Sequence, residues 1–154
     1  MSEVLLRKDV PAQAKWQTSH IYASQEEWEK DFQWIQEKAK ELAAYAGTLK
    51  NGKDTVLSLL KTYAESSEHL SRLYTYASCN LNVDNGDSFN QGVMARTQTL
   101  YAQYSAAVAF ISPELLKLPK ATLKGYIADP DFADFDVMLK DLEEKQVTAV
   151  SDIN

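Results

Sequence analysis

The side chains of this 154-residue chain that could bind a metal ion start with two histidines, His20 and His69. A helical zinc hydrolase site needs two imidazoles one turn apart with a glutamate beside them, as in His-Glu-x-x-His. Neither histidine has a second one at that spacing. Glu65 and Glu68 lie within one turn of His69, which allows a partial metal site or a solvated helix face with one ion pair. We favour the ion pair, worth roughly a few tenths of a kcal/mol.

Nucleophilic and ion-binding motifs are equally sparse. Cys79 is the only cysteine, so the chain can form no internal disulfide and no thiolate metal cluster. No histidine is near it in sequence, and we expect a small buried or half-buried side chain. The chain has no Gly-x-Ser-x-Gly motif and no phosphate-binding glycine loop. We therefore assign no catalytic, metal-binding or cofactor-binding residue, and substrate-binding residues stay unassigned.

The segment 82–87 is rich in oxygen ligands, as calcium loops are. An EF-hand loop needs a glycine at its sixth position and a glutamate at its twelfth. Counted from Asn82, Gly86 falls one position early and Val93 takes the place of the glutamate. Because Asn and Gly tolerate positive φ, we interpret the segment as a turn between two helices.

Tyrosines are concentrated between residues 63 and 104. Side chains of this type could line a peptide groove, since each offers a broad apolar area with a polar tip. They could equally lie at the seam between two helices with their hydroxyls at its rim, which we favour for an isolated domain. The tyrosines concerned are Tyr63, Tyr74, Tyr76, Tyr101 and Tyr104.

The spacing of apolar residues predicts the helices that position these groups. Ser24 and Glu27 form a capping-box pattern, and an apolar stripe follows it to Gly47, which is placed as the residue after the helix. A second helix is predicted from an N-cap at Asp54 to about Leu81, and a third from near Ser88 to Ile111. The predicted buried positions are Trp28, Phe32, Ile35, Ala39, Leu42 and Ala46, then Val56, Leu60, Tyr63, Ser67, Leu70, Tyr74, Ala77 and Leu81, then Val93, Thr97, Leu100, Tyr104, Ala107 and Ile111.

Prolines divide the rest of the chain into two or three short helices. Ser112 and Pro113 are predicted as the N-cap and first residue of one of them, and the last is expected from Phe135 to about Lys145. The predicted fold is all-α, an antiparallel bundle of three long helices capped by the short C-terminal ones. We expect an extended lead-in over 1–23 that packs Trp16, Ile21 and Tyr22 on the domain, a bundle domain over 24–145 and a tail over 146–154.

Composition restricts the partners. The chain carries 16 basic and 22 acidic residues, a net charge of −6, and no clustered basic stripe, so we expect no nucleic-acid ligand. No apolar run approaches the roughly 20 residues that cross a bilayer, and the first ten residues are too polar for a signal peptide. We therefore expect a cytoplasmic protein without a membrane partner.

A series of short motifs runs through almost the whole chain in a fixed order. They are Arg7-x-Asp9-Val10-Pro11, Lys15-Trp16, Ile21-Tyr22-x-Ser24, Trp28, Asp31, Gly47-Thr48-Leu49, Leu73-Tyr74-x-Tyr76-Ala77, Phe110-Ile111-x-Pro113-Glu114-Leu115-Leu116, Leu123-x-x-Tyr126 and Asp134-Phe135. This set resembles the start of oligoendopeptidase F-type proteins. The chain departs from that family at Thr18 and His20, where leucine and aspartate are usual. It departs again after Glu144, where residues 146–150 replace a basic, histidine-containing stretch.

The resemblance implies a parent protein that is a zinc metalloendopeptidase cutting oligopeptides inside the cell. In that family the His-Glu-x-x-His helix lies far downstream, in a catalytic domain that would be the partner of this chain. The N-terminal helices are similar to one wall of a channel that admits short peptides. Zinc is then a cofactor of the full-length parent and not of this chain.

Two functions follow as hypotheses. The first is a non-catalytic N-terminal helical domain of such a peptidase, which packs on the catalytic domain and helps to select peptides. The second is a free-standing helical interaction module without enzymatic activity. A domain separated from its partner would expose an apolar face and tend to self-associate, so a monomer without such a face would favour the module.

Overall fold

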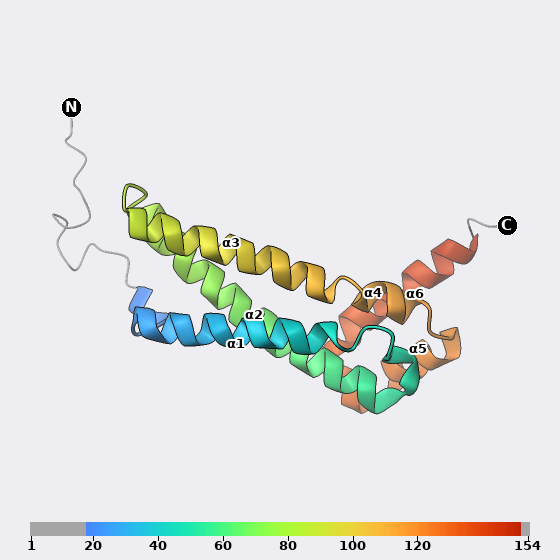
Figure 1. The fold of residues 1–154 in the computed structure, drawn as a ribbon. Helices are drawn as coiled ribbons and strands as arrows, with labels where there is room; N and C mark the ends of the chain where they lie inside the picture. The colour runs from blue at the N-terminus through green and yellow to red at the C-terminus, as the bar shows by residue number, and fades with distance from the viewer. Residues whose placement is uncertain (1–17, 152–154) are drawn as a thin grey trace. The chain divides into compact units, whose positions relative to one another are not determined.

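The computed structural model describes residues 18–151, and every regular element within them is a helix (Figure 1). The predicted all-α class, with three long helices followed by short ones, is confirmed. Trp16 and most of the expected lead-in lie outside the described residues. The elements are η3 (Thr18–His20), α1 (Gln25–Ala43), η4 (Leu49–Asn51), α2 (Lys53–Val83), α3 (Ser88–Val108), α4 (Ile111–Leu116), α5 (Lys120–Ala128), η5 (Pro130–Phe135) and α6 (Asp136–Ser151).

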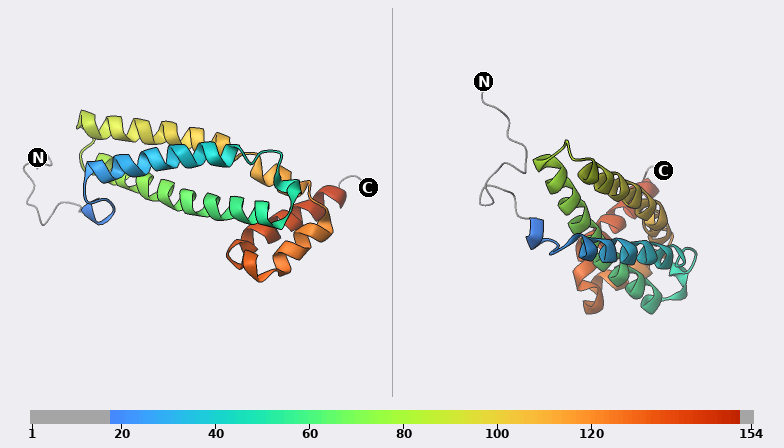
Figure 2. Two further views of the ribbon diagram at one scale, coloured as in Figure 1. Left: turned by 60° about the horizontal axis from the view of Figure 1, so that its bottom comes forward. Right: turned by 60° about the vertical axis from the view of Figure 1, so that its left-hand side comes forward.

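The chain divides into two compact units, which we describe separately. In its described part, unit 1 consists of residues 18–37 and 66–104, and unit 2 consists of residues 38–65 and 105–151. Unit 1 holds the first part of α1, the second part of α2 and most of α3. Unit 2 holds the other parts of α1 and α2, the end of α3 and the short helices α4, α5 and α6. Figure 2 draws α5 and α6, which pack against each other, in orange and red.

In unit 1 the helix segments run antiparallel and bury one stripe each. In α1, Trp28, Phe32 and Ile35 are buried as predicted, whereas Ala46, the last residue of the predicted stripe, lies beyond the end of the helix and is exposed. In α2, however, Ser66 and Leu73 are buried where Ser67 and Tyr74 were expected. At about 100° per residue, the predicted positions Ser67 and Tyr74 lie within about 20° of Val56 around the helix axis, whereas Ser66 and Leu73 lie about 80° and 100° away. The buried face of α2 in unit 1 is therefore turned from the predicted one. The unit 1 core comprises Tyr22, Trp28, Phe32, Ile35, Ser66, Leu70, Leu73, Ala77, Val93, Met94, Thr97, Leu100 and Tyr104.

Unit 2 is built around the short helices, with α6 packed against α4, α5 and η5. The carboxylate of Asp129 caps η5 by accepting the N–H of Asp131, and both aspartates lie 2.7 Å from the ammonium of Lys53 at the start of α2. The side chains buried in this unit are Ala39, Leu42, Leu49, Val56, Leu59, Leu60, Ile111, Leu115, Leu118, Leu123, Tyr126, Phe132, Phe135, Leu139 and Leu142.

The first predicted helix boundaries hold with small shifts. Ser24 Oγ accepts the N–H of Glu27, as in the predicted capping box. The Glu27 carboxylate accepts the N–H of Ala23, whereas in a standard capping box it would accept the N–H of Ser24. Gly47 has φ +81°, as a residue after a helix often has, although α1 itself ends at Ala43.

Several predicted boundaries were wrong, among them the end of the third helix, which lies at Val108 and not at Ile111. Asp54 is not the N-cap of α2, because Gly52 at φ +132° brings the chain into a helix that begins at Lys53. Ser112 is not an N-cap, since α4 begins at Ile111. Pro113 is tolerated at the third helical position because first-turn N–H groups have no helical partner.

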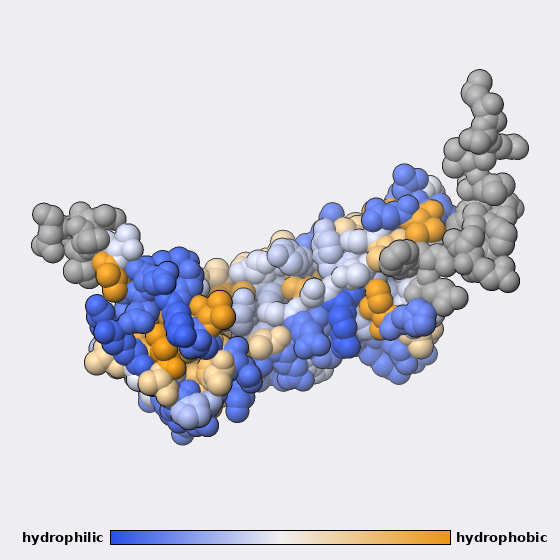
Figure 3. Space-filling view, turned by 180° about the vertical axis from the view of Figure 1, so that it is seen from behind, coloured by the Kyte–Doolittle hydropathy of each residue, from blue (hydrophilic) through white to orange (hydrophobic). Residues whose placement is uncertain are grey.

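The last helix does not end near Lys145 but continues to Ser151. No glycine or proline interrupts residues 146–151, and the Gln146 amide donates to the carbonyls of Leu116 and Leu118. Among the residues that the structure describes, no helix is both long and apolar enough to cross a membrane. On the face drawn in Figure 3, hydrophobic residues reach the surface as separate patches among hydrophilic ones.

Candidate functional site

The polar centre of unit 1 is the carboxylate of Asp31, in α1. Its Oδ1 lies 2.6 Å from Nδ1 of His69 in α2, and its Oδ2 accepts a hydrogen bond from the hydroxyl of Tyr22. The ring of Trp34 lies 4.4 Å from the His69 ring, and the Tyr76 ring meets Tyr22 edge to face. This network joins α1, α2 and the segment before α1. It offers a carboxylate, an imidazole and a phenol, all of them already hydrogen-bonded to one another.

The network corrects the expectation for His69. The favoured ion pair was placed on one face of the helix with Glu65, but the partner is Asp31 of another helix. Within residues 18–151, no three His, Cys, Asp or Glu side chains come together in a way that could hold a metal ion. The side chains of this part of the chain therefore do not fit a zinc site, and we derive no catalytic step through zinc.

The phenol of Tyr22 should make the free energy of unfolding depend on pH above about pH 10. Burial, the hydrogen bond to Asp31 and the negative charge of that carboxylate raise the pKa of Tyr22 well above its usual value. The unfolded chain loses this proton near pH 10, while the folded chain keeps it, so the stabilisation is present below about pH 10 and declines as the pH rises. We expect the free energy of unfolding of the wild type to fall more steeply above pH 10 than that of Tyr22→Phe. Equal slopes in urea titrations at a series of pH values would contradict the assignment.

A second polar contact in unit 1 joins α3 to α1. The guanidinium of Arg96 binds both carboxylate oxygens of Glu29, with Nη2 at 2.8 Å from Oε2. The Cζ atom of Arg96 lies 5.2 Å from the ring centre of Trp28 and 4.6 Å from that of Phe32. The hydrogen bond lowers the pKa of Glu29 and raises that of Arg96. Arg96 is thus fixed as a structural contact by charge and by ring stacking.

The tyrosines of α2 and α3 differ in burial. Tyr104 is buried, and its hydroxyl lies 2.7 Å from Ser66 Oγ and 3.0 Å from Ser67 Oγ, as expected for a residue at the seam. Tyr74 and Tyr101 are 37% and 53% exposed, and their ring centres lie 6.0 Å apart. Tyr104 and the exposed pair thus all lie where α2 and α3 meet, as the favoured interpretation predicts, with the Tyr74 and Tyr101 rings at the surface.

The remaining sequence candidates lie in α2 and in the turn that follows it. Cys79 is half-buried, as expected. In the turn between α2 and α3, Asp87 Oδ1 accepts the N–H of Phe89, and Asn90 donates to the carbonyls of Asn80 and Asp84. These hydrogen bonds hold the turn between α2 and α3. The segment is thus an interhelical turn, as the position of Gly86 indicated.

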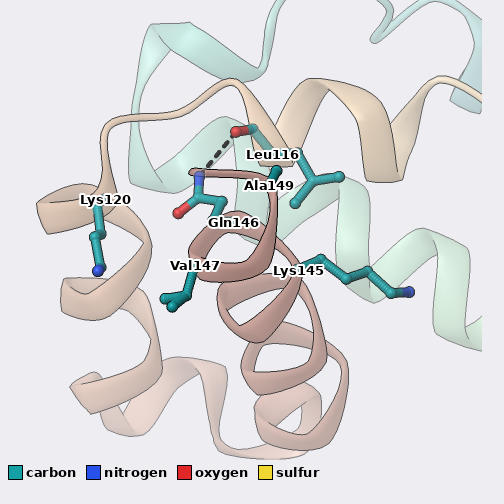
Figure 4. A pocket seen from close by; sticks show the side chains of 6 residues that line it. All are labelled: Leu116, Lys120, Lys145, Gln146, Val147 and Ala149. Atoms are coloured by element: carbon teal, nitrogen blue, oxygen red, sulfur yellow. Dashed lines mark hydrogen bonds between the residues drawn. The ribbon is translucent and has the colours of Figure 1, made fainter. Parts of the chain in front are cut away.

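Sequence reasoning missed a pocket in unit 2. Its volume is about 500 Å³, and it lies beside the end of α6 (Figure 4). Lys120 and Lys145 extend to opposite sides of it, and Lys145 lies 2.8 Å from Asp141. The amide of Gln146 is held by its two donated bonds, which leaves Oε1 buried without a hydrogen-bond partner. The lining residues are Leu116, Lys120, Lys145, Gln146, Val147 and Ala149.

This lining is suited to an apolar group and contains no acid–base pair. No local signal predicted the pocket, because it depends on how α4, α5 and α6 pack and on the helical continuation past Lys145. In both units, side-chain hydrogen bonds link neighbouring elements to one another.

The chain is similar to bacterial peptidases of greater length. It is 34% identical over 125 residues to oligopeptidase PepF of Bacillus subtilis, and the match covers 81% of this chain and 19% of that protein. It is 25% identical over 146 residues to the chromosomal oligoendopeptidase F of Lactococcus lactis subsp. cremoris, covering 91% of this chain and 24% of the relative. No family model matches the chain.

The fold is also found in a solved structure. A crystal structure of a provisionally named peptidase from Chlamydophila abortus matches with a TM-score of 0.83 and 19% identity, over 94% of this chain and 25% of the other. The chain spans about a fifth of the length of the curated relatives that it matches. By sequence and fold, the chain belongs to the oligoendopeptidase F family.

Proposed function

We propose that this chain is the non-catalytic N-terminal helical domain of a cytoplasmic, zinc-dependent oligoendopeptidase. In this role it packs on a catalytic domain that carries the zinc ligands and forms part of the wall of the substrate channel. The chain contributes no metal ligand and no nucleophile of its own. Its helices restrict the space through which an oligopeptide reaches the catalytic domain.

One observation carries this proposal: nearly the whole chain matches only about a fifth of each oligopeptidase. The two histidines lie 49 positions apart, so the sequence contains no His-Glu-x-x-His motif. Imidazole pairs one turn apart are what a helical zinc peptidase site requires. The fixed contacts of Asp31 and Arg96 suit a rigid wall, because both side chains tie neighbouring helices together.

A chimera tests the proposal directly. The matched residues of the Bacillus subtilis oligopeptidase are replaced by this chain, and hydrolysis of a quenched fluorescent oligopeptide is measured. We expect the chimera to hydrolyse the peptide within about tenfold of the parent kcat/KM, since the catalytic domain is unchanged and the wall keeps its fold. Deletion of the same residues should abolish activity.

The 154-residue chain alone is the necessary control. It should show no zinc-dependent hydrolysis of the same peptide at any zinc concentration tested. Zinc-dependent cleavage by the pure chain would contradict a non-catalytic domain. A chimera that folds, binds zinc and is inactive would contradict the wall role and favour a separate interaction module.

A further inference from the structure

Unit 1 exposes an uncharged strip between α2 and α3, which we name the tyrosine seam. Its α2 side consists of Ser71, Tyr74 and Ser78, spaced by three and four residues, so they share one side of the helix. Its α3 side consists of Gln91, Gln98 and Tyr101, at spacings of seven and three. The Tyr74 and Tyr101 rings meet across the strip, and Ser78 Oγ lies 4.0 Å from the sulfur of Met94. All six residues are exposed or half-exposed.

The charge distribution sets this strip apart from the rest of unit 1. Arg96 is the one charged residue among the 21 of α3, and it is paired with Glu29. The unit 1 part of helix α1 has the opposite character, with charged side chains at six of its 13 positions from 25 to 37: Glu26, Glu27, Glu29, Lys30, Asp31 and Glu37. In unit 1, the exposed surface of α1 is therefore rich in charge, whereas that of α3 carries Arg96 alone.

The side chains of the seam define the chemistry of a ligand. Serine hydroxyls and glutamine amides both donate and accept hydrogen bonds, and tyrosine adds rigid apolar area with a polar tip. The side chains of the seam carry no charge and therefore offer no ion pair to a ligand. A peptide main chain is neutral and alternates donors and acceptors, and so it complements these groups.

We propose that the tyrosine seam binds the main chain of an extended oligopeptide, with little dependence on the charge of its side chains. The inference rests on the proposed function, since the relatives are named as oligopeptidases. At 1.5 Å per residue the seam is about 10 to 15 Å long. At about 3.3 Å per residue in an extended chain, it takes roughly three to five peptide residues.

The test uses the 154-residue chain and a blocked, uncharged peptide of about six alanine, serine and threonine residues, long enough to cover the seam. In an NMR titration of the isotope-labelled chain, we expect amide shifts concentrated along the seam. The double variant with Tyr74→Ala and Tyr101→Ala should bind about tenfold more weakly, because it removes two aromatic anchors. Replacing two serines of the peptide with lysine, or two with glutamate, should change the affinity by less than about threefold.

A matched control is Phe89→Ala. Phe89 is a 58% exposed aromatic residue of the same helix, and its distance of twelve residues from Tyr101 places it about 120° around the helix axis. This variant should bind the peptide like the wild type. The variant with Tyr74→Phe and Tyr101→Phe keeps the ring area and should retain most of the affinity. Far-UV circular dichroism checks that each variant is folded.

Several results would overturn the inference. These are the absence of shifts at millimolar peptide, shifts confined to the unit 2 pocket, and equal affinity in the double alanine variant. Loss of self-association in that variant without loss of peptide binding would also overturn it, by assigning the seam to a second copy of the chain. If the chimera is active and any of these results is found, the seam inference is wrong while the proposed function stands. If the chimera is inactive and the seam still binds the peptide, the proposed role as a channel wall is wrong while peptide binding at the seam stands.

Discussion

Replacing Trp28 with alanine is expected to lower the free energy of unfolding by about 3 to 5 kcal/mol, the usual cost of removing a large aromatic ring from a core. Trp28 is fully buried in unit 1. Its ring packs on Phe32 at 5.2 Å between centres and also lies under the guanidinium of Arg96. Its Nε1–H donates to the carbonyl of Leu73 in α2 at 3.5 Å. One substitution therefore removes contacts to α1, α2 and α3 together.

Urea unfolding followed by far-UV circular dichroism measures the effect. Phe89→Ala serves as the control, since it removes an aromatic ring that is 58% exposed and should change stability by less than about 0.5 kcal/mol. Trp28→Phe should fall between the two, because it keeps a ring but loses the N–H donor. A loss for Trp28→Ala no larger than that of Phe89→Ala would mean that this ring does not anchor the unit.

Replacing Phe132 with alanine should lower the free energy of unfolding of unit 2 by a similar amount, about 3 to 5 kcal/mol. Phe132 is 1% exposed in the short η5 helix, and its ring stacks on Tyr126 of α5 with 4.7 Å between centres. A helix of six residues has little stability of its own, so its position depends on this burial and on the cap at Asp129. Loss of the ring should release η5 from α5.

Differential scanning calorimetry is a suitable measurement for this second substitution. Phe132→Leu, which keeps most of the apolar volume, should lose less than half as much stability as Phe132→Ala. Val137→Ala is the exposed control, because that side chain is 83% exposed at the start of α6. If the melting temperature of Phe132→Ala were unchanged from the wild type, like that of the Val137→Ala control, the stacked arrangement would be contradicted.

The local patterns of the sequence determined the helices. Each of them depends on residues three or four positions apart, as in the capping pair of Ser24 and Glu27 or the stripe through Trp28, Phe32 and Ile35. Such contacts form within one helix, so the sequence predicts them without knowledge of the fold. Positive φ at Gly47 is predictable for the same reason.

Only the tertiary structure decided which side chains meet across helices. Asp31 and His69 are 38 positions apart, and Arg96 and Glu29 are 67 apart. Whether such residues meet depends on the rotation and register of two packed helices, which a drift of about 20° per heptad is enough to change. The exposure of Tyr74 and the pocket around Gln146 arise in the same way. The sequence determined the helices and family of this protein, while the packing of those helices determined its surface, because contacts between distant residues leave no periodic signal in the chain.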